Sequence, residues 1–526
     1  MADYKKFGVM IDCSRNAVML PSQVKKFTEY IKKIGYDTLL LYMEDTYAID
    51  GEPYFGYMRG RYTAEELRDI DIYAKNKGVE VIPCIQTLAH FHTLVRHDTY
   101  KDIVDTADVL LAGEEKTYTL IERMFETISK TFSSKNVHIG MDEAKFLGTG
   151  KYLQKNGYVK PFEILKEHLR KVVEIAKKYG LKPIIWSDML FYESNNGCYY
   201  GKDIQIPSNV SECLPKDVQL AYWDYYHYKK EEYDGMIKSH ELLNRPLWFC
   251  GAVWTWCGFV PLWEKTLRTM KEAMQSVRER GVNQVMITMW GDGGKECSYF
   301  SALPLLYAVR QYADGNFDEN AIRDGFFQTT GLQFNDFQLI SKINGCDCLQ
   351  NLYTCSMHLY NDCLLGFNDC FVEENGEIPY NEYKEEIREI KRRVREFAYI
   401  FDTIEKLCNV LQIKYDFGVR LRKAYRQNDK KELKKIYNEC DLLIRRINVF
   451  YQSFKRLWHI ENKAFGFEVQ TLRIGALIQR IKDCKQLLKD YFSKKITAIS
   501  QLEETPLRRG VYDAQYLSLF SAGRNE

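Results

Sequence analysis

Two hydrophobic patterns divide the chain into an N-terminal and a C-terminal region. In roughly the first 310 residues, short continuous apolar runs alternate with amphipathic stretches, and afterwards amphipathic stretches dominate. Continuous apolar runs are expected of parallel strands that are buried on both faces. Eight such runs predict strands over residues 7–13, 38–44, 79–86, 137–143, 183–189, 218–224, 247–254 and 284–290.

Helices are predicted between these runs by recognisable start signals. Pro21 and Pro161 each stand at the first position of an amphipathic stretch, where proline is favoured. Thr63 and Glu66 have the spacing of a capping box. The stretch after Met189 is polar and rich in Tyr, Asn and Gly, so the fifth helix is expected to be weak or missing.

Eight strand–helix units in about 300 residues predict a (β/α)₈ barrel, a fold of the α/β class. The alternative is a doubly wound open sheet, which the lack of Gly-x-Gly-x-x-Gly after the first run disfavours. We expect a catalytic barrel over residues 1–312 and an α-helical C-terminal domain over residues 313–526. Apolar stripes at helical spacing mark the second region: Ile387, Ile390, Val394 and Phe397; Leu443, Ile447, Phe450 and Phe454; Leu477, Ile481 and Leu487.

Composition narrows the function classes. The formal net charge of the 526 residues is +2, so no global field indicates nucleic acid. We see no signal peptide and no apolar stretch long enough to span a membrane. The 15 cysteines are irregularly spaced, which favours reduced thiols in the cytoplasm. Cys346 and Cys348 lack a second pair of ligands, so we expect neither a metal nor a cofactor.

Candidate chemistry gathers where the predicted strands end. A barrel carries its catalytic groups at the carboxyl ends of its strands. The fourth run ends in Asp142 and Glu143, and two adjacent acids there are costly unless they serve a purpose. Neighbouring strand residues point to opposite sides, so these two can share a site only where the backbone turns. The other run ends supply Arg15, Glu44, Asp45, His90, His92, Trp186, Asp188, Tyr222, Asp224, Trp254, Trp256, Trp290 and Asp292.

Carboxylates, aromatic rings and one arginine around one rim are typical of a sugar-binding pocket. Each residue also has a plainer interpretation. Asp142 and Glu143 could cap a helix, and Tyr222 or Trp254 could belong to the core. Asp188 could be a supporting buried acid or a cap, and Glu44 an ordinary loop acid.

The segment from His138 to Glu143 resembles the His-x-Gly-x-Asp-Glu signature of glycoside hydrolase family 20, the β-N-acetylhexosaminidases. Further family landmarks follow in barrel order over roughly residues 5–310: Arg15, His90, Trp186, Tyr222-Trp223-Asp224 and Trp290-Gly291-Asp292. Asp292 replaces the usual glutamate, and Glu296 is close enough in sequence to compensate. We expect the family's frequent N-terminal α/β domain to be absent, and the helical tail is similar to that of single-barrel bacterial members.

The resemblance implies an exo-acting enzyme that removes terminal, non-reducing β-linked GlcNAc or GalNAc from an oligosaccharide or glycoconjugate with retention. Glu143 would be the general acid, and the substrate's own 2-acetamido oxygen would attack the anomeric carbon. Asp142 would orient the acetamido group, and Tyr222 would hydrogen-bond its oxygen. Arg15, His90, Asp224 and Asp292 would bind the sugar, and Trp186, Trp254 and Trp290 would wall it.

Two rival functions stay open on sequence grounds. One is a retaining glycosidase in which an enzyme carboxylate such as Asp224 is the nucleophile. The other is a catalytically silent sugar-binding barrel. The choice between GlcNAc and GalNAc and the nature of the aglycone are also open. The helical domain offers a surface for a homodimer or for completing a neighbour's site.

Overall fold

The computed structural model describes residues 4–202, 204–345 and 352–507. Cys346 and Cys348, considered above as metal ligands, lie outside the described residues. By contact density the chain forms two compact units. The barrel unit comprises Met1–Val253, Thr266–Trp290 and Leu305–Gly331, and the helical unit comprises Trp254–Lys265, Gly291–Pro304 and Leu332–Glu526. The boundary at residue 312 between a catalytic and a C-terminal domain stays a prediction.

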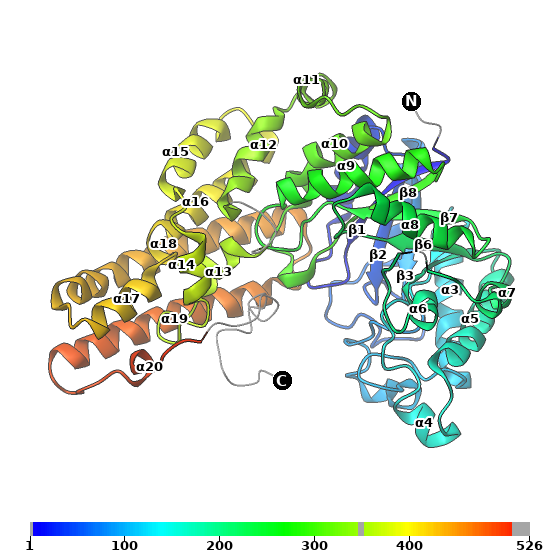
Figure 1. Cartoon of the computed structure of the whole chain (residues 1–526), viewed down its shortest axis with the longest axis horizontal. Helices are drawn as coiled ribbons and strands as arrows, with labels where there is room; N and C mark the ends of the chain where they lie inside the picture. The colour runs from blue at the N-terminus through cyan, green and yellow to red at the C-terminus, as the bar shows by residue number, and fades with distance from the viewer. Residues whose placement is uncertain (1–3, 203, 346–351, 508–526) are drawn as a thin grey trace. The chain divides into compact units, whose positions relative to one another are not determined.

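The barrel unit contains eight parallel strands in sequence order, closed by pairing of the first with the last (Figure 1). This confirms the predicted (β/α)₈ barrel. Nearly every side chain in the strands is buried, on the inner or the outer face, which explains why the runs are continuously apolar. The strands are β1 (Lys6–Asp12), β2 (Thr38–Glu44), β3 (Glu80–Ile85), β4 (Asn136–His138), β5 (Lys182–Trp186), β6 (Gln219–Trp223), β7 (Leu247–Ala252) and β8 (Gln284–Met289).

The fourth strand is shorter than the sequence predicted. It ends at His138 rather than at residue 143, and it joins β3 through the single pair Cys84 and His138. Gly140 and Met141 both have φ of +71°, a left-handed conformation that no strand can continue. The chain therefore leaves the barrel wall before it reaches the two acids.

Helices of the expected kind follow the strands. Pro21 and Pro161 stand at the first helical positions of their helices, and Thr63 and Glu66 form the predicted capping box. Between β5 and β6 the described residues form two short helices, in line with the weak fifth helix expected from the polar sequence there. The helices are α1 (Pro21–Lys33), α2 (Ala64–Asn76), α3 (Glu115–Thr131), α4 (Lys151–Asn156), α5 (Pro161–Lys178), α6 (Asp188–Ser194), α7 (Ser208–Cys213), α8 (Lys230–Glu241), α9 (Trp263–Glu279), α10 (Leu303–Ala313) and α11 (Glu319–Thr330), with a 3₁₀ turn at Asp98–Ile103.

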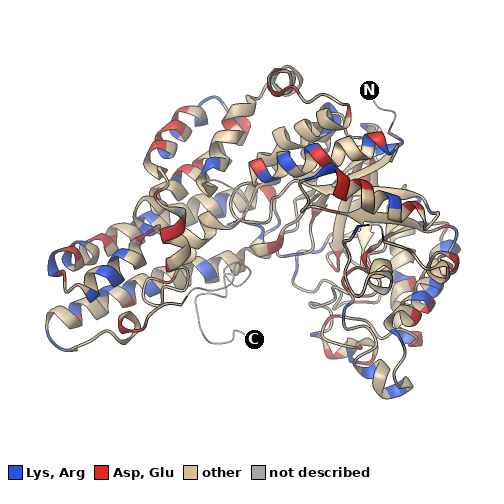
Figure 2. Ribbon diagram, viewed as in Figure 1, with Lys and Arg blue, Asp and Glu red and all other residues tan. Residues whose placement is uncertain are grey.

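The helical unit is built around three long helices, α16, α18 and α19, which pack in succession. Acidic and basic residues alternate along their outer faces (Figure 2). The predicted stripes are buried except at their end, where Leu488 rather than Leu487 faces the core. Its helices are α12 (Phe334–Ser341), α13 (Thr354–Tyr360), α14 (Asp369–Asn375), α15 (Tyr380–Lys391), α16 (Ala398–Lys414), α17 (Phe417–Arg426), α18 (Lys430–Glu461), α19 (Phe467–Phe492) and α20 (Ser500–Glu503), with 3₁₀ turns at Asp292–Gly294, Tyr299–Ala302, Lys342–Asn344 and Arg395–Phe397.

Within the described residues, no helix has the length and apolar character needed to cross a membrane.

Candidate active site

Asp142 and Glu143 lie in an irregular turn that follows β4. Gly140, Met141 and Glu143 all have positive φ, the last at +50°, so the alternation of a regular strand is lost. Glycine is required at position 140, because a Cβ atom there would lie 1.9 Å from Gln86 Oε1. The turn lets two adjacent carboxyl groups share one neighbourhood: His90 Nε2 is 3.1 Å from Asp142 Oδ2 and 3.9 Å from Glu143 Oε2.

Asp142 is held from both sides. Gln86 Nε2 donates to Asp142 Oδ1 at 2.9 Å, and His90 occupies Oδ2. Gln86 also fixes the turn itself, because its Oε1 accepts a hydrogen bond from the backbone N–H of Met141 at 3.2 Å. Burial opposes the charge of Asp142, but His90 and Gln86 outweigh it and hold the pKa of this carboxyl below its usual value. Burial likewise opposes the charge of His90, but Asp142 raises the pKa of His90 to about 10. At neutral pH the two form an ion pair.

Glu143 is the more open of the two acids, with 47% of its side chain exposed. Partial burial and the nearby charge of Asp142 raise the pKa of Glu143 above its ordinary value. Its backbone N–H donates to Asp188 Oδ2 at 2.9 Å. Asp188 is fully buried at the start of α6, where burial and the charge of Asp142 raise its pKa to about 7. Asp188 thus anchors the strained residue that carries the candidate acid.

A hydrogen-bonded chain extends from Asp142 to the end of β1. Gln86 Nε2 donates to the Tyr42 hydroxyl at 2.8 Å, and that hydroxyl donates to Glu44 Oε1 at 3.2 Å. Arg15 Nη1 donates to the same carboxylate at 3.2 Å. Burial, only partly offset by Arg15, raises the pKa of Glu44 to about 7. This chain of hydrogen bonds, through Gln86, Tyr42 and Glu44, therefore connects the Asp142 turn to Arg15.

Two tryptophans and a histidine border this cluster. Trp290 packs edge-on against Tyr42 at 4.8 Å between ring centroids, and the Arg15 guanidinium lies 5.9 Å from its ring. Trp186 lies 6.2 Å from Trp290 and 4.4 Å from His138. Burial lowers the pKa of His138 to about 3, so this ring is neutral. The Trp186 indole N–H is buried and finds no hydrogen-bond acceptor among the described residues, which leaves a donor for a ligand.

No group of three or more His, Cys, Asp or Glu side chains in the described part of the chain is arranged to hold a metal ion. The cluster instead combines a paired carboxylate, a carboxyl with raised pKa and aromatic rings, which suits acid–base chemistry on a sugar.

Two family models match the chain: the catalytic domain of glycosyl hydrolase family 20 over residues 43–239, and the glycoside hydrolase 20C C-terminal domain over residues 334–516. The chain belongs to glycoside hydrolase family 20.

Named relatives are distant. Human hexosaminidase D is 22% identical over 214 residues, which is 39% of this chain and 42% of that protein. A β-hexosaminidase of Vibrio furnissii is 24% identical over 252 residues, or 40% of each chain. The chain therefore spans less than half of the length of either relative. A crystal structure of the exo-β-N-acetylglucosaminidase of Vibrio harveyi superposes with a TM-score of 0.48 and 16% identity, covering 65% of this chain and 59% of that one.

Not every residue suggested by the family landmarks joins the cluster. Tyr222 lies on the outer face of β6, where its ring packs against His240 of α8 and Phe249 of β7. Its hydroxyl donates to Asp224 Oδ2 at 2.6 Å, and burial together with Asp224 raises the pKa of Tyr222 well above 10. Asp224 is fully buried and also contacts His227 Nδ1 at 2.7 Å. The structure thus supports the plainer interpretation of Tyr222 as a core residue, because the strand alternates and Tyr222 takes the face opposite the barrel interior.

Tyr225 is a candidate site residue that the sequence reasoning missed. It follows β6 by two residues, is buried, and its hydroxyl hydrogen-bonds with the side chains of Thr288 and Trp290. Gln86 was missed as well, and Glu44 was taken for a loop acid. The neighbouring Tyr225-Tyr226 pair after an apolar run was a usable signal, whereas nothing in the sequence marks Gln86.

Trp254 and Asp292 belong to segments of the helical unit. Trp254 stacks on Trp256 with 4.2 Å between centroids, and Lys265 Nζ lies 4.4 Å from its ring. Asp292 begins a 3₁₀ turn and is half-buried. Glu296 is fully engaged nearby, because Tyr360 donates to it at 2.7 Å and Arg473 lies at 3.5 Å. Which of the two acids, Asp292 or Glu296, binds sugar hydroxyls stays a prediction.

Proposed function

We propose that this family 20 protein is an exo-β-N-acetylhexosaminidase, which hydrolyses terminal non-reducing β-linked GlcNAc or GalNAc with retention. The names of its relatives, a hexosaminidase and a β-hexosaminidase, support this substrate class. The observation that carries the proposal is the Asp142–Glu143 turn, where two adjacent carboxyls have pKa values displaced in opposite directions. Opposite displacements keep Asp142 ionised and let Glu143 hold a proton closer to neutral pH, so that one carboxyl carries charge and the other donates a proton.

Glu143 is the general acid in this account. Its raised pKa keeps a proton available closer to neutral pH, and its half-exposed position gives a glycosidic oxygen access to it. After the leaving group departs, the same carboxylate activates water.

Asp142 is the group that stabilises positive charge. Its lowered pKa keeps it ionised, and two fixed donors, Gln86 and His90, prevent it from turning away. A carboxylate held in this way can orient the substrate's acetamido N–H and stabilise the oxazolinium that forms when the acetamido oxygen attacks. Asp224 is a weak candidate for a nucleophile, because Tyr222 and His227 already occupy its Oδ2.

The aromatic residues would form the pocket for the acetyl group and the sugar face. The 6.2 Å between the Trp186 and Trp290 rings supports their predicted roles as walls of this pocket. The hydrogen bond to the acetamido oxygen, first assigned to Tyr222, is better assigned to Tyr225, whose hydroxyl lies beside Trp290. Arg15, anchored by Glu44, would hold sugar hydroxyls. A cytoplasmic location and a homodimer stay predictions from the sequence.

Replacing Glu143 by glutamine tests the acid assignment. Glu143→Gln keeps the shape and removes the proton, so kcat on an unactivated disaccharide should fall by about 10²–10⁴. The loss should be smaller with an aryl leaving group, which needs less protonation. Glu163→Gln, on the exposed surface of α5 beside Lys166, is the matched control and should leave both rates unchanged. Wild-type hydrolysis of the disaccharide by Glu143→Gln would refute the assignment.

A further inference from the structure

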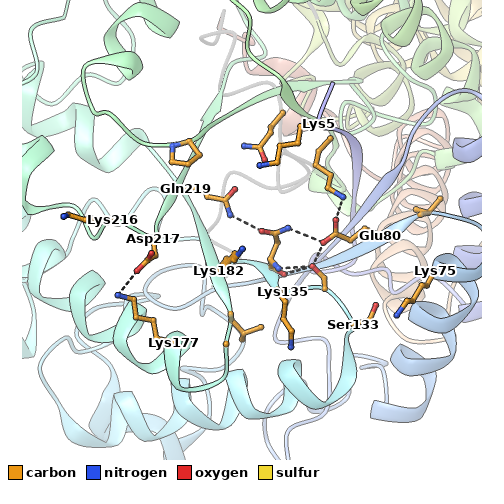
Figure 3. A pocket seen from close by; sticks show the side chains of 18 of the residues that line it. Lys5, Lys75, Glu80, Ser133, Lys135, Lys177, Lys182, Lys216, Asp217 and Gln219 are labelled. Atoms are coloured by element: carbon orange, nitrogen blue, oxygen red, sulfur yellow. Dashed lines mark hydrogen bonds and ion pairs between the residues drawn. The ribbon is translucent and has the colours of Figure 1, made fainter. Parts of the chain in front are cut away.

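A second candidate site lies at the opposite end of the barrel from the two acids. A hollow of about 1120 Å³ opens at the amino ends of the strands (Figure 3). Six of its lining residues are the first residues of their strands: Lys6, Glu80, Asn136, Lys182, Gln219 and Gln284. A seven-residue strand such as β1 spans about 20 Å, so this hollow is separate from the Asp142–Glu143 turn.

The floor of the hollow is a connected polar layer. Gln219 Nε2 donates to Asn136 Oδ1 at 3.1 Å, and Asn136 Nδ2 donates to Glu80 Oε1 at 3.2 Å. These bonds fix the orientation of both amides. Gln284, the first residue of β8, completes the floor and is 6% exposed.

The rim carries a large excess of positive charge. Seven lysines and two carboxylates line the hollow, in a chain whose whole net charge is only +2. Both carboxylates are already paired, Glu80 with Lys6 at 2.5 Å and Asp217 with Lys177 at 2.7 Å. The other five lysines form no ion pair with any described residue, and Figure 3 shows them around the opening: Lys5, Lys75, Lys135, Lys182 and Lys216.

Helix dipoles explain only part of this arrangement. Lys75 and Lys177 lie in the last turns of α2 and α5, where a cation offsets the partial negative charge of the helix end. Lys135, Lys182 and Lys216 lie in no helix. Like charges that gather without counter-ions repel one another, and an anion bound among them relieves that cost.

We propose that the amino end of the barrel binds a chain of two or more phosphate groups. Among the described residues, no arginine lines the hollow to bind one phosphate in a fixed bidentate geometry, and several lysines suit a multivalent anion instead. The described residues that line it include no aromatic side chain, so they offer no stacking surface to a nucleobase. The ligand is therefore recognised by closely spaced phosphates, supplied by an inorganic polyphosphate or by a nucleotide.

Titration calorimetry of the full chain with tripolyphosphate tests the proposal. Binding should be saturable and stronger than that of orthophosphate. It should also weaken when the salt concentration rises from about 10 mM to about 100 mM, because the screening length then falls from about 30 Å to about 10 Å. Lys135→Glu/Lys182→Glu should weaken it by about tenfold or more, because both side chains are exposed on the rim and each reversal changes the local charge by two. Lys135→Gln/Lys182→Gln should have an intermediate effect.

Lys434→Glu/Lys435→Glu is the matched control. These exposed lysines lie on α18 in the helical unit, and their reversal changes the net charge equally. The control should bind tripolyphosphate like the wild type, and all variants should keep wild-type glycosidase activity, which separates this proposal from the proposed function. A nucleoside triphosphate should bind no more tightly than tripolyphosphate. Tighter binding of the nucleoside triphosphate would identify a nucleotide as the source of the phosphates. No binding, or equal loss in the control and the rim variant, would overturn the proposal.

Discussion

Gly140→Ala is the substitution whose effect follows most directly from the structure of the site. Its φ of +71° makes any side chain unfavourable, at about 1–2 kcal/mol. The added Cβ would also lie 1.9 Å from Gln86 Oε1 and 2.3 Å from Gln86 Cδ, so the Gln86 amide must move. That amide donates to Asp142 at 2.9 Å. Loss of a hydrogen bond to a charged group costs about 1.5–3 kcal/mol. If that bond strengthens in the transition state, kcat should fall by about 10- to 150-fold.

The control is Gly180→Ala. Gly180 has nearly the same φ, +67°, but nothing lies within 4 Å of the Cβ position. Both variants should lose similar backbone stability in thermal unfolding, and the steric clash should add about 1–3 kcal/mol for Gly140→Ala alone. The assay is steady-state hydrolysis of an aryl β-N-acetylglucosaminide at a temperature where both variants are folded. A folded Gly140→Ala enzyme with wild-type kcat, or an equal loss in Gly180→Ala, would refute the reasoning.

Asp188→Asn keeps an oxygen that accepts the Glu143 N–H but removes the negative charge that Asp188 gains as pH rises through its pKa near 7. Without that charge nearby, Glu143 should give up its proton more readily. The alkaline limb of kcat/KM should therefore move to lower pH. Asp188→Leu removes the acceptor as well and should lower kcat at every pH; identical pH profiles for wild type and Asp188→Asn would contradict the coupling. Tyr225→Phe should cost about 1–3 kcal/mol of transition-state stabilisation, or about 5- to 150-fold in kcat, whereas Tyr222→Phe should change Tm more than kcat. A larger loss of kcat in Tyr222→Phe than in Tyr225→Phe would instead support Tyr222 as the residue that hydrogen-bonds the acetamido oxygen.

The barrel could be predicted because its pattern is strong. Parallel strands buried on both faces give continuous apolar runs, and proline starts and a capping box separate them. The same property hides the direction of each side chain. In β6 both faces are buried, so hydrophobicity does not reveal that Tyr222 faces α8 rather than the barrel interior. The face on which Tyr222 lies could not be predicted, because the sequence carries no register information, which only strand pairing supplies.

Other parts of the site depend on tertiary contacts that leave no sequence pattern. Gln86 becomes significant only because the Gly140 turn brings Met141 and Asp142 to its amide. Glu44 ends a strand like an ordinary loop acid, and its partner Arg15 comes from the loop that follows β1. The expected turn at Asp142 and Glu143 was deducible from the alternation of strands, but its position, directly after His138, was not.

The central claim, that the substrate's acetamido group is the nucleophile, is tested most directly by comparing two substrates. An aryl β-N-acetylglucosaminide and the matching aryl β-glucoside differ at C2, where the glucoside has a hydroxyl in place of the acetamido group, and have the same leaving group. A well-placed intramolecular nucleophile gives effective molarities of about 10⁵ M or more, so kcat/KM should favour the acetamido sugar by at least about 1,000-fold. Comparable turnover of the two, or a covalent glycosyl-enzyme trapped with a 2-fluoro sugar, would show that an enzyme carboxylate attacks instead.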